Sequence, residues 1–66
     1  MPIQEIAKIV RDQLNDEKTH TLSDLVQETL KSVSEHVYPS DVKSVVFGLI
    51  QNKEVVMTND FKIKKS

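Results

Sequence analysis

The residues of this sequence that could do chemistry are lysines, and they gather near its end. In the segment KEVVMTNDFKIKK, residues 53–65, Lys62 and Lys64 are two positions apart and would project from one face of a β-strand. Such side chains can neutralise the phosphates of a nucleic acid. Lysines on an exposed strand also prevent edge-to-edge pairing and keep a small protein soluble, so both interpretations stay open. The other basic candidates are Lys43, Lys53 and Lys65.

The distribution of charge along the chain also distinguishes its C-terminal part. The net charge of the whole sequence is −1. Residues 1–41 carry 4 basic and 8 acidic side chains, whereas residues 42–66 carry 5 basic and 2 acidic ones. The first part therefore has a net charge of −4 and the second part +3. This asymmetry favours a polyanionic partner for the C-terminal part.

No other set of residues indicates catalysis or metal binding. The sequence has no cysteine, which excludes disulfides and thiolate zinc sites. His20 and His36 are sixteen residues apart, with no cysteine to complete a metal site. The serines and carboxylates are scattered, without a glycine-rich phosphate loop or a nucleophile turn. We therefore expect a protein that is not an enzyme and that needs no cofactor and no metal.

The 66 residues are enough for one small domain, which we place at residues 1–66. The N-terminus lacks the pattern of a secretory signal, and no apolar run approaches the roughly 18 residues needed to span a membrane. The absence of cysteine also fits an intracellular protein. We expect a cytoplasmic protein with no membrane partner.

Hydrophobic periodicity predicts three helices, at about residues 2–15, 22–35 and 40–52. In each segment, apolar residues recur three or four positions apart and form one stripe, which would face a common core. Ile9 falls outside the stripe of the first helix. The stripes are Ile3, Ile6, Ala7, Val10 and Leu14; then Leu22, Leu25, Val26, Leu30 and Val33; then Val42, Val45, Val46, Leu49 and Ile50.

Local signals mark the beginning of two helices. Thr21 is followed three residues later by Asp24, which is typical of a capping box. Pro39 disfavours helical angles at Tyr38 and so separates the second helix from the third. Either Tyr38 or Ser40 would then be the N-cap of the third helix.

The residues at about 54–64 predict a β-hairpin, with Asn59-Asp60 as a two-residue turn. In this register Val56, Thr58, Phe61 and Ile63 face the helices, and Val55, Met57, Lys62 and Lys64 face outward. The KTHT segment before the second helix is a candidate for a third strand. Phe47 is expected to pack in the core against the hairpin.

The order of helix, short strand, helix, turn, helix and two-stranded wing resembles the winged helix-turn-helix family. The likeness is carried by HTLSDLV and YPSDVKSVVFGLIQNKEVVMTNDFKIKK and covers nearly the whole chain. It implies an α+β fold with three helices and a C-terminal hairpin wing. It also implies that the third helix enters the DNA major groove while the wing lies along the backbone or minor groove. The groove-facing positions would be Ser40, Lys43, Ser44, Phe47 and Gln51, and the wing contacts Lys62, Lys64 and Lys65.

Two functions follow as hypotheses. The first is a DNA-binding protein, either a transcriptional regulator or a phage-type or recombination accessory factor, associated with the nucleoid. Residues 40–52 hold no arginine, so a single copy would read bases weakly and binding as a dimer or cooperatively is expected. The second is a winged-helix module that binds a protein partner without contacting DNA. Its candidate contact residues are Ile9, Gly48, Val55 and Met57.

Overall fold

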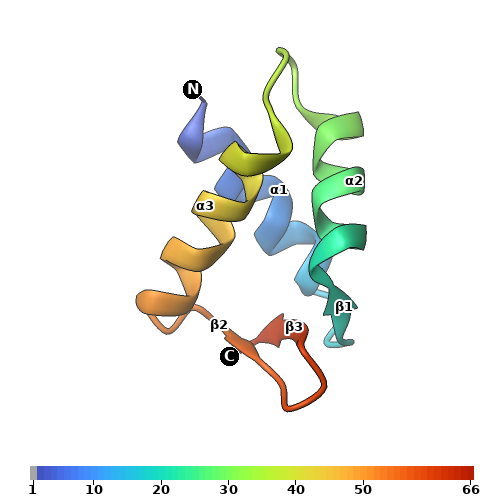
Figure 1. The fold of residues 1–66 in the computed structure, drawn as a ribbon, viewed down its shortest axis with the longest axis vertical. Coiled ribbons are helices and arrows are strands. Elements are labelled where there is room, and N and C mark those ends of the chain that lie inside the picture. The colour runs from blue at the N-terminus through green and yellow to red at the C-terminus, as the bar shows by residue number, and fades with distance from the viewer. Residues whose placement is uncertain (1) are drawn as a thin grey trace.

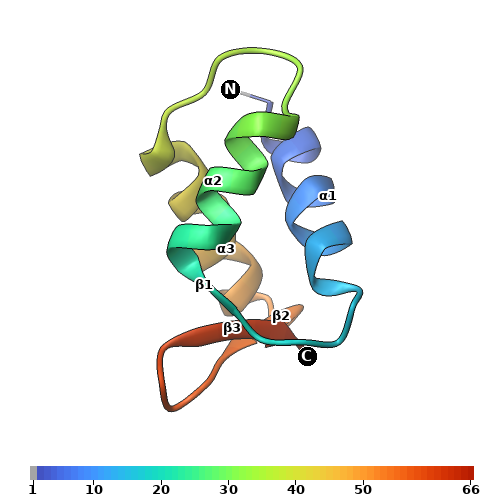
Figure 2. The same ribbon diagram turned by 90° about the vertical axis from the view of Figure 1, so that its right-hand side faces the viewer.

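The computed structural model describes residues 2–66, which form three helices and a three-stranded antiparallel sheet (Figure 1). This is the α+β arrangement that the sequence predicts. The helices pack together, and the sheet lies at one end of the bundle (Figures 1 and 2). Within the described residues, no helix is both long enough and apolar enough to cross a membrane. The elements are α1 (Ile3–Leu14), β1 (His20–Thr21), α2 (Leu22–Ser32), α3 (Pro39–Gln51), β2 (Val55–Met57) and β3 (Lys62–Lys65).

One hydrophobic core joins all three helices to the sheet. Each helix turns most of its apolar stripe inward, as periodicity predicts, because removing these side chains from water is the main favourable term in folding. The exception is Ile3 at the start of α1, which was predicted to face the core and is 54% exposed. The sheet adds one side chain from each of its last two strands. The largest fully buried apolar side chains are Ile6, Val10, Leu14, Leu25, Val42, Val46, Val55 and Ile63.

The beginnings of α2 and α3 follow the local signals in the sequence. The hydroxyl of Thr21 accepts a hydrogen bond of 3.1 Å from the backbone N–H of Asp24. Tyr38 is the N-cap of α3, with Pro39 in the first turn, and its backbone N–H donates to the Asp41 carboxylate at 3.0 Å. Of the two predicted caps, Tyr38 therefore holds the position and Ser40 lies inside the helix. The second helix ends at Ser32, three residues before its predicted end.

The C-terminal hairpin, residues 55–65, differs from the prediction in its turn. Thr58 to Phe61 lie between the two strands, and the N–H of Thr58 donates to the carbonyl of Lys62, so the loop beyond this pair consists of Asn59 to Phe61. Met57 is opposite Ile63 rather than Lys62. Phe61 adopts a left-handed conformation with φ 63, whereas neither Asn59 nor Asp60 has a positive φ. Such a loop needs one residue at positive φ, whereas the favoured two-residue turns of type I′ need two.

Because the register differs by one residue, each side chain of β2 points to the face of the sheet opposite to the predicted one. Val55 is 2% exposed and points into the core, so the prediction that it faces outward is wrong. Met57 shares the face of Val55 and Ile63, and Val56 lies on the opposite face beside Lys64. Phe61, predicted to face the helices, is 77% exposed. Ile63 is buried, as predicted.

The third strand predicted before the second helix is present as β1. His20 pairs with Ile63 and Thr21 with Lys62, so the strand order is β1-β3-β2. The lysine-bearing strand β3 is therefore the central strand, hydrogen-bonded on both sides. This arrangement fixes the directions in which the side chains of β3 project.

Candidate nucleic-acid interface

The exposed side of α3 carries small and polar residues together with one aromatic ring. It is opposite the stripe that enters the core, because side chains of a helix advance by about 100° per residue. Phe47 is 46% exposed, so the prediction that it packs in the core is wrong. Phe47 lies about 200° around the helix axis from the buried Val45, so its side chain points away from the core. The hairpin, against which Phe47 was expected to pack, lies at the C-terminal end of α3 (Figure 1). The exposed residues on this side are Ser40, Lys43, Ser44, Phe47 and Gln51.

The C-terminal hairpin extends to the same side of the molecule as α3. In Figure 2 its loop projects away from α1, to the side on which α3 lies, at the end of the bundle opposite the first turns of α3. Lys62 and Lys64 lie on the outer face of β3, as predicted, with Lys62 half-buried and Lys64 exposed. Lys65, the next residue, is exposed.

Most of these lysines have no ionic partner within the chain. In residues 2–66, no carboxylate lies within 4.0 Å of the ammonium of Lys43, Lys53, Lys64 or Lys65. The ammonium of Lys62 is 3.8 Å from an Asp60 carboxylate oxygen, and the side chains of Lys62 and Asp60 are 44% and 66% exposed. An exposed pair of this kind adds little to the stability of the fold, because water screens the two charges. All five ammonium groups can therefore exchange water for an external anion at small cost.

Asp60 is the acidic group at the tip of the hairpin. The Thr58 hydroxyl donates a hydrogen bond to its carboxylate, and this bond, with a smaller effect of the nearby Lys62 ammonium, lowers the pKa of Asp60 below its ordinary value of 3.8. The carboxylate is thus ionised at neutral pH. It is turned toward Thr58 and Lys62, which reduces its repulsion of a phosphate.

Lys53 is held at the corner between α3 and β2. It has a positive φ of 64 and ends the helix in a Schellman motif. Its backbone N–H donates to the carbonyl of Ile50 at 3.0 Å, and the N–H of Glu54 donates to the carbonyl of Leu49 at 3.0 Å. This turn exposes the Lys53 side chain between the helix and the hairpin.

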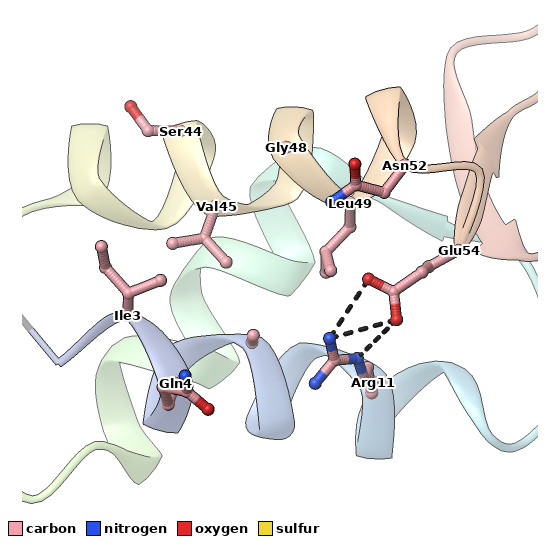
Figure 3. A pocket seen from close by; sticks show the side chains of 10 residues that line it. Ile3, Gln4, Arg11, Ser44, Val45, Gly48, Leu49, Asn52 and Glu54 are labelled. Carbon is pink, nitrogen blue, oxygen red and sulfur yellow. Dashed lines mark hydrogen bonds and ion pairs between the residues drawn. The ribbon is translucent and has the colours of Figure 1, made fainter.

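Glu54 is used inside the chain. Arg11 donates to its carboxylate through Nε and Nη2, each at 3.2 Å, in a bidentate pair that joins α1 to the start of β2 (Figure 3). One of the two acidic residues of the C-terminal part is therefore neutralised by a residue of the N-terminal part. This pairing leaves the hairpin more positive than its sequence alone indicates.

The four candidates for a protein contact do not form one surface. Val55 is buried, which removes it from any contact. Gly48 lines a groove of about 340 Å³ between α1 and α3 (Figure 3). Ile9 is half-buried on the flank of α1 that faces α2, four residues before Gln13, whose amide donates to the Thr29 hydroxyl at 2.9 Å. Met57 lies on β2 and is 38% exposed.

Gly48 is not required by close packing within the chain. A Cβ atom built at this position would meet nothing within 4 Å. The groove is lined by apolar side chains of both helices together with polar ones, and the Arg11–Glu54 pair lies at one end of it. Ile3 lies on the wall of the groove, with 54% of its surface exposed.

Sequence reasoning missed two exposed aromatic residues. A two-residue turn puts Phe61 on the inner face of the hairpin, whereas the alternative loop of three residues leaves its ring exposed. Tyr38, considered only as a helix cap, is 64% exposed and packs edge-to-face on His36, with ring centroids 5.1 Å apart. The exposed rings near the lysines are therefore Phe47 and Phe61.

The histidines and acidic residues do not gather into a metal site in residues 2–66. His20 Nε2 is 3.0 Å from the Asp16 carboxylate. This contact, with the backbone N–H of Lys18, lowers the pKa of Asp16 below 3.8. His36 is exposed in the loop between α2 and α3.

Comparisons with protein-family models, with curated proteins and with solved structures found no match for this chain. A functional assignment therefore depends on the geometry of the exposed side of α3 and of the C-terminal hairpin. These two elements present lysines, small polar side chains and two aromatic rings.

Proposed function

We propose that this chain is a small protein that binds double-stranded DNA in the manner of a winged helix-turn-helix domain. It would act in the cytoplasm as a transcriptional regulator or as a phage-type or recombination accessory factor. The observation that supports this most strongly is the position of the five C-terminal lysines. They lie on α3, just after its C-terminal end and on the hairpin that follows at that end of the bundle, and four of them have no ionic partner within residues 2–66.

The shape of α3 suits the major groove. An α-helix with its side chains is about 10–12 Å across, and the major groove of B-DNA is about 12 Å wide. Ser40 and Ser44 are small and exposed, so this side of the helix could approach base edges closely. Gln51 could bond to adenine, and Lys43 could bond to guanine or to a phosphate.

The hairpin would contribute affinity rather than specificity. Lys62 and Lys64 project from the central strand of the sheet, whose backbone is bonded on both sides, so their positions are fixed before DNA is bound. Contacts to phosphates position a protein without reading sequence. With no arginine on α3, one copy would discriminate weakly between sequences, and we propose that it binds as a dimer or cooperatively.

Fluorescence anisotropy with a 30-base-pair duplex of random sequence tests this proposal. For three to five phosphate contacts, the logarithm of affinity should fall with that of salt concentration with a slope of roughly −3 to −4.5. Replacing the outer-face lysines, Lys62→Glu with Lys64→Glu, should abolish binding at moderate salt. The matched control, Lys8→Glu with Lys31→Glu, makes the same charge change on α1 and α2 and should bind better than the hairpin variant. Absence of binding by the unaltered chain at low salt, or equal losses in the two variants, would contradict the proposal.

The groove between α1 and α3 favours a second candidate function, the binding of a protein partner without DNA. The apolar side chains on its walls and the open space above Gly48 could receive a side chain from another protein. Sedimentation velocity would then show a dimer or complex. Gly48→Leu, which fills the groove, should prevent its formation. This outcome, together with no duplex binding at low salt, would favour the second function over the first.

A further inference from the structure

The tip of the C-terminal hairpin exposes an aromatic ring in a conformation that aromatic residues rarely adopt. Phe61 is 77% exposed and has φ 63. Positive φ is uncommon for residues other than glycine, asparagine and aspartate, and for a bulky side chain it is an outlier. Backbone conformations of this kind often occur where a side chain must be presented to a ligand.

The loop around Phe61 is closed by its own hydrogen bonds. The N–H of Phe61 donates to the carbonyl of Thr58 at 3.0 Å, and the N–H of Thr58 donates to the carbonyl of Lys62 at 2.7 Å. The N–H of Lys62 donates to the Thr58 hydroxyl at 3.1 Å. This network fixes the loop, so the ring is held outward by the turn and is not a side chain that failed to reach the core.

The ring stands among groups that suit DNA. Lys62 is the next residue, Lys64 lies two residues further along the same strand, and the loop projects from the body of the molecule (Figures 1 and 2). Asp60 is the one opposing charge in the loop, and its carboxylate is engaged by Thr58 and Lys62. An apolar group at the end of a narrow hairpin, with cations behind it, could enter a groove while the cations hold the phosphates on either side.

We propose that Phe61 is a wedge that enters the DNA minor groove and partly unstacks one base step, so that binding bends the duplex. This inference rests on the proposed DNA-binding function and goes beyond it, because lysines alone would bind a straight duplex. Proteins that insert apolar wedges between base steps kink DNA by about 20–90°. Pyrimidine–purine steps such as TA unstack most easily, so the wedge selects a flexible step rather than a hydrogen-bonded sequence.

The test uses a 30-base-pair duplex with one central TA step, a donor and an acceptor dye at its ends, and 2-aminopurine beside the step. The unaltered chain should raise two signals, the energy transfer between the two dyes and the fluorescence of 2-aminopurine.

Phe61→Gly removes the ring and suits the positive φ, so it should fold at least as well as the parent. This variant should still bind in a salt-dependent way, with an affinity roughly 5- to 100-fold lower, as expected for the loss of one stacked aromatic ring. Both fluorescence signals should stay as they are in free DNA. Ile3→Ala, which removes an exposed apolar group at the far end of the bundle, should behave as the parent chain.

The outcomes separate this inference from the function on which it rests. Lysine-dependent duplex binding without a change in either signal, or with the same signals in Phe61→Gly, would overturn the wedge and leave DNA binding intact. Tighter binding to the single-stranded 30-mer, lost in Phe61→Gly, would also overturn it, because the ring would then stack on unpaired bases. No duplex binding at low salt would overturn both proposals.

Discussion

At the scale of single residues, the backbone is most unusual at three positions. Among residues 2–66, the non-glycine residues with positive φ are Glu17, Lys53 and Phe61. Each lies where the chain reverses: after α1, after α3 and in the hairpin loop. A left-handed conformation costs an L-residue about 1–2 kcal/mol relative to the right-handed one. Each position is therefore a place where the fold imposes its geometry on a residue type that does not favour it.

Lys53→Gly should stabilise the fold. Glycine adopts positive φ without steric cost, although its more flexible unfolded state offsets part of the gain, so we expect an increase of up to about 1 kcal/mol in the free energy of unfolding. Urea denaturation followed by circular dichroism measures this change. Lys64→Gly, which removes the same charge within a strand, should have the opposite sign. A loss of stability in Lys53→Gly would show that the Schellman turn is not strained.

Two exposed carboxylates predict the response of the fold to acid. Hydrogen bonds from His20 and from Thr58 lower the pKa values of Asp16 and Asp60 below 3.8. A group whose pKa is lower in the folded state contributes stability above its unfolded pKa, and this contribution is lost as the pH falls through the folded value. Thermal melts should therefore show stability falling below about pH 3.8, less steeply in a chain with Asp16→Asn and Asp60→Asn. Equal slopes in the two chains would contradict this.

At the scale of elements, local signals in the sequence were sufficient for the beginnings of α2 and α3 but not for the end of α2 or for the hairpin. The stripe ending at Leu14, the cap at Thr21 and the break at Pro39 all act within a few residues, so each could be recognised without knowing the fold. The register of the hairpin depends on whether one residue, Phe61, accepts a positive φ. Nothing in its type indicates this, and the error of one residue exchanged the faces of Val55 and Val56.

The N-cap of α2 offers a quantitative check at this scale. Thr21→Ala removes the hydroxyl that accepts from the N–H of Asp24, and loss of such a cap costs about 1 kcal/mol. The melting temperature should fall by roughly 4–8 °C for a domain of this size. Ser23→Ala, at an exposed position in the first turn of the same helix, should change it little. Equal effects of the two changes would mean that the cap bond does not stabilise the helix.

At the scale of the whole molecule, sequence reasoning placed the lysines better than the protein contacts. The outward direction of Lys62 and Lys64 follows from the alternation of side chains along β3 alone. This prediction is therefore correct although the predicted register of the hairpin is wrong. Grouping Ile9 with Gly48 required knowing which flank of α1 faces α2 and which faces α3. Which flank of α1 faces which helix is decided by the packing of all three helices together, and hydrophobic periodicity does not predict it.

Packing also joins the hairpin to the bundle as one folding unit. Ile63 is 0% exposed, is opposite His20 and Met57 in the sheet, and belongs to the same core as the helices. Replacing such a residue by alanine costs about 2–5 kcal/mol, which is a large part of the roughly 3–10 kcal/mol expected for a domain of this length. Ile63→Ala should therefore destabilise all elements together, in one transition at a much lower temperature, whereas Lys64→Ala should melt as the parent chain does.

Amide hydrogen exchange measured beside circular dichroism would distinguish this from a hairpin that unfolds separately. If the amides of α1 and α3 kept their protection in Ile63→Ala while those of β2 and β3 lost it, the hairpin would be an independent unit. A shared loss would mean that the outer-face lysines are positioned only when the helices are packed. If the chain binds duplex DNA as proposed, the affinity of Ile63→Ala should then fall with the folded fraction, and an isolated hairpin peptide with the same lysines should bind less tightly than the whole chain.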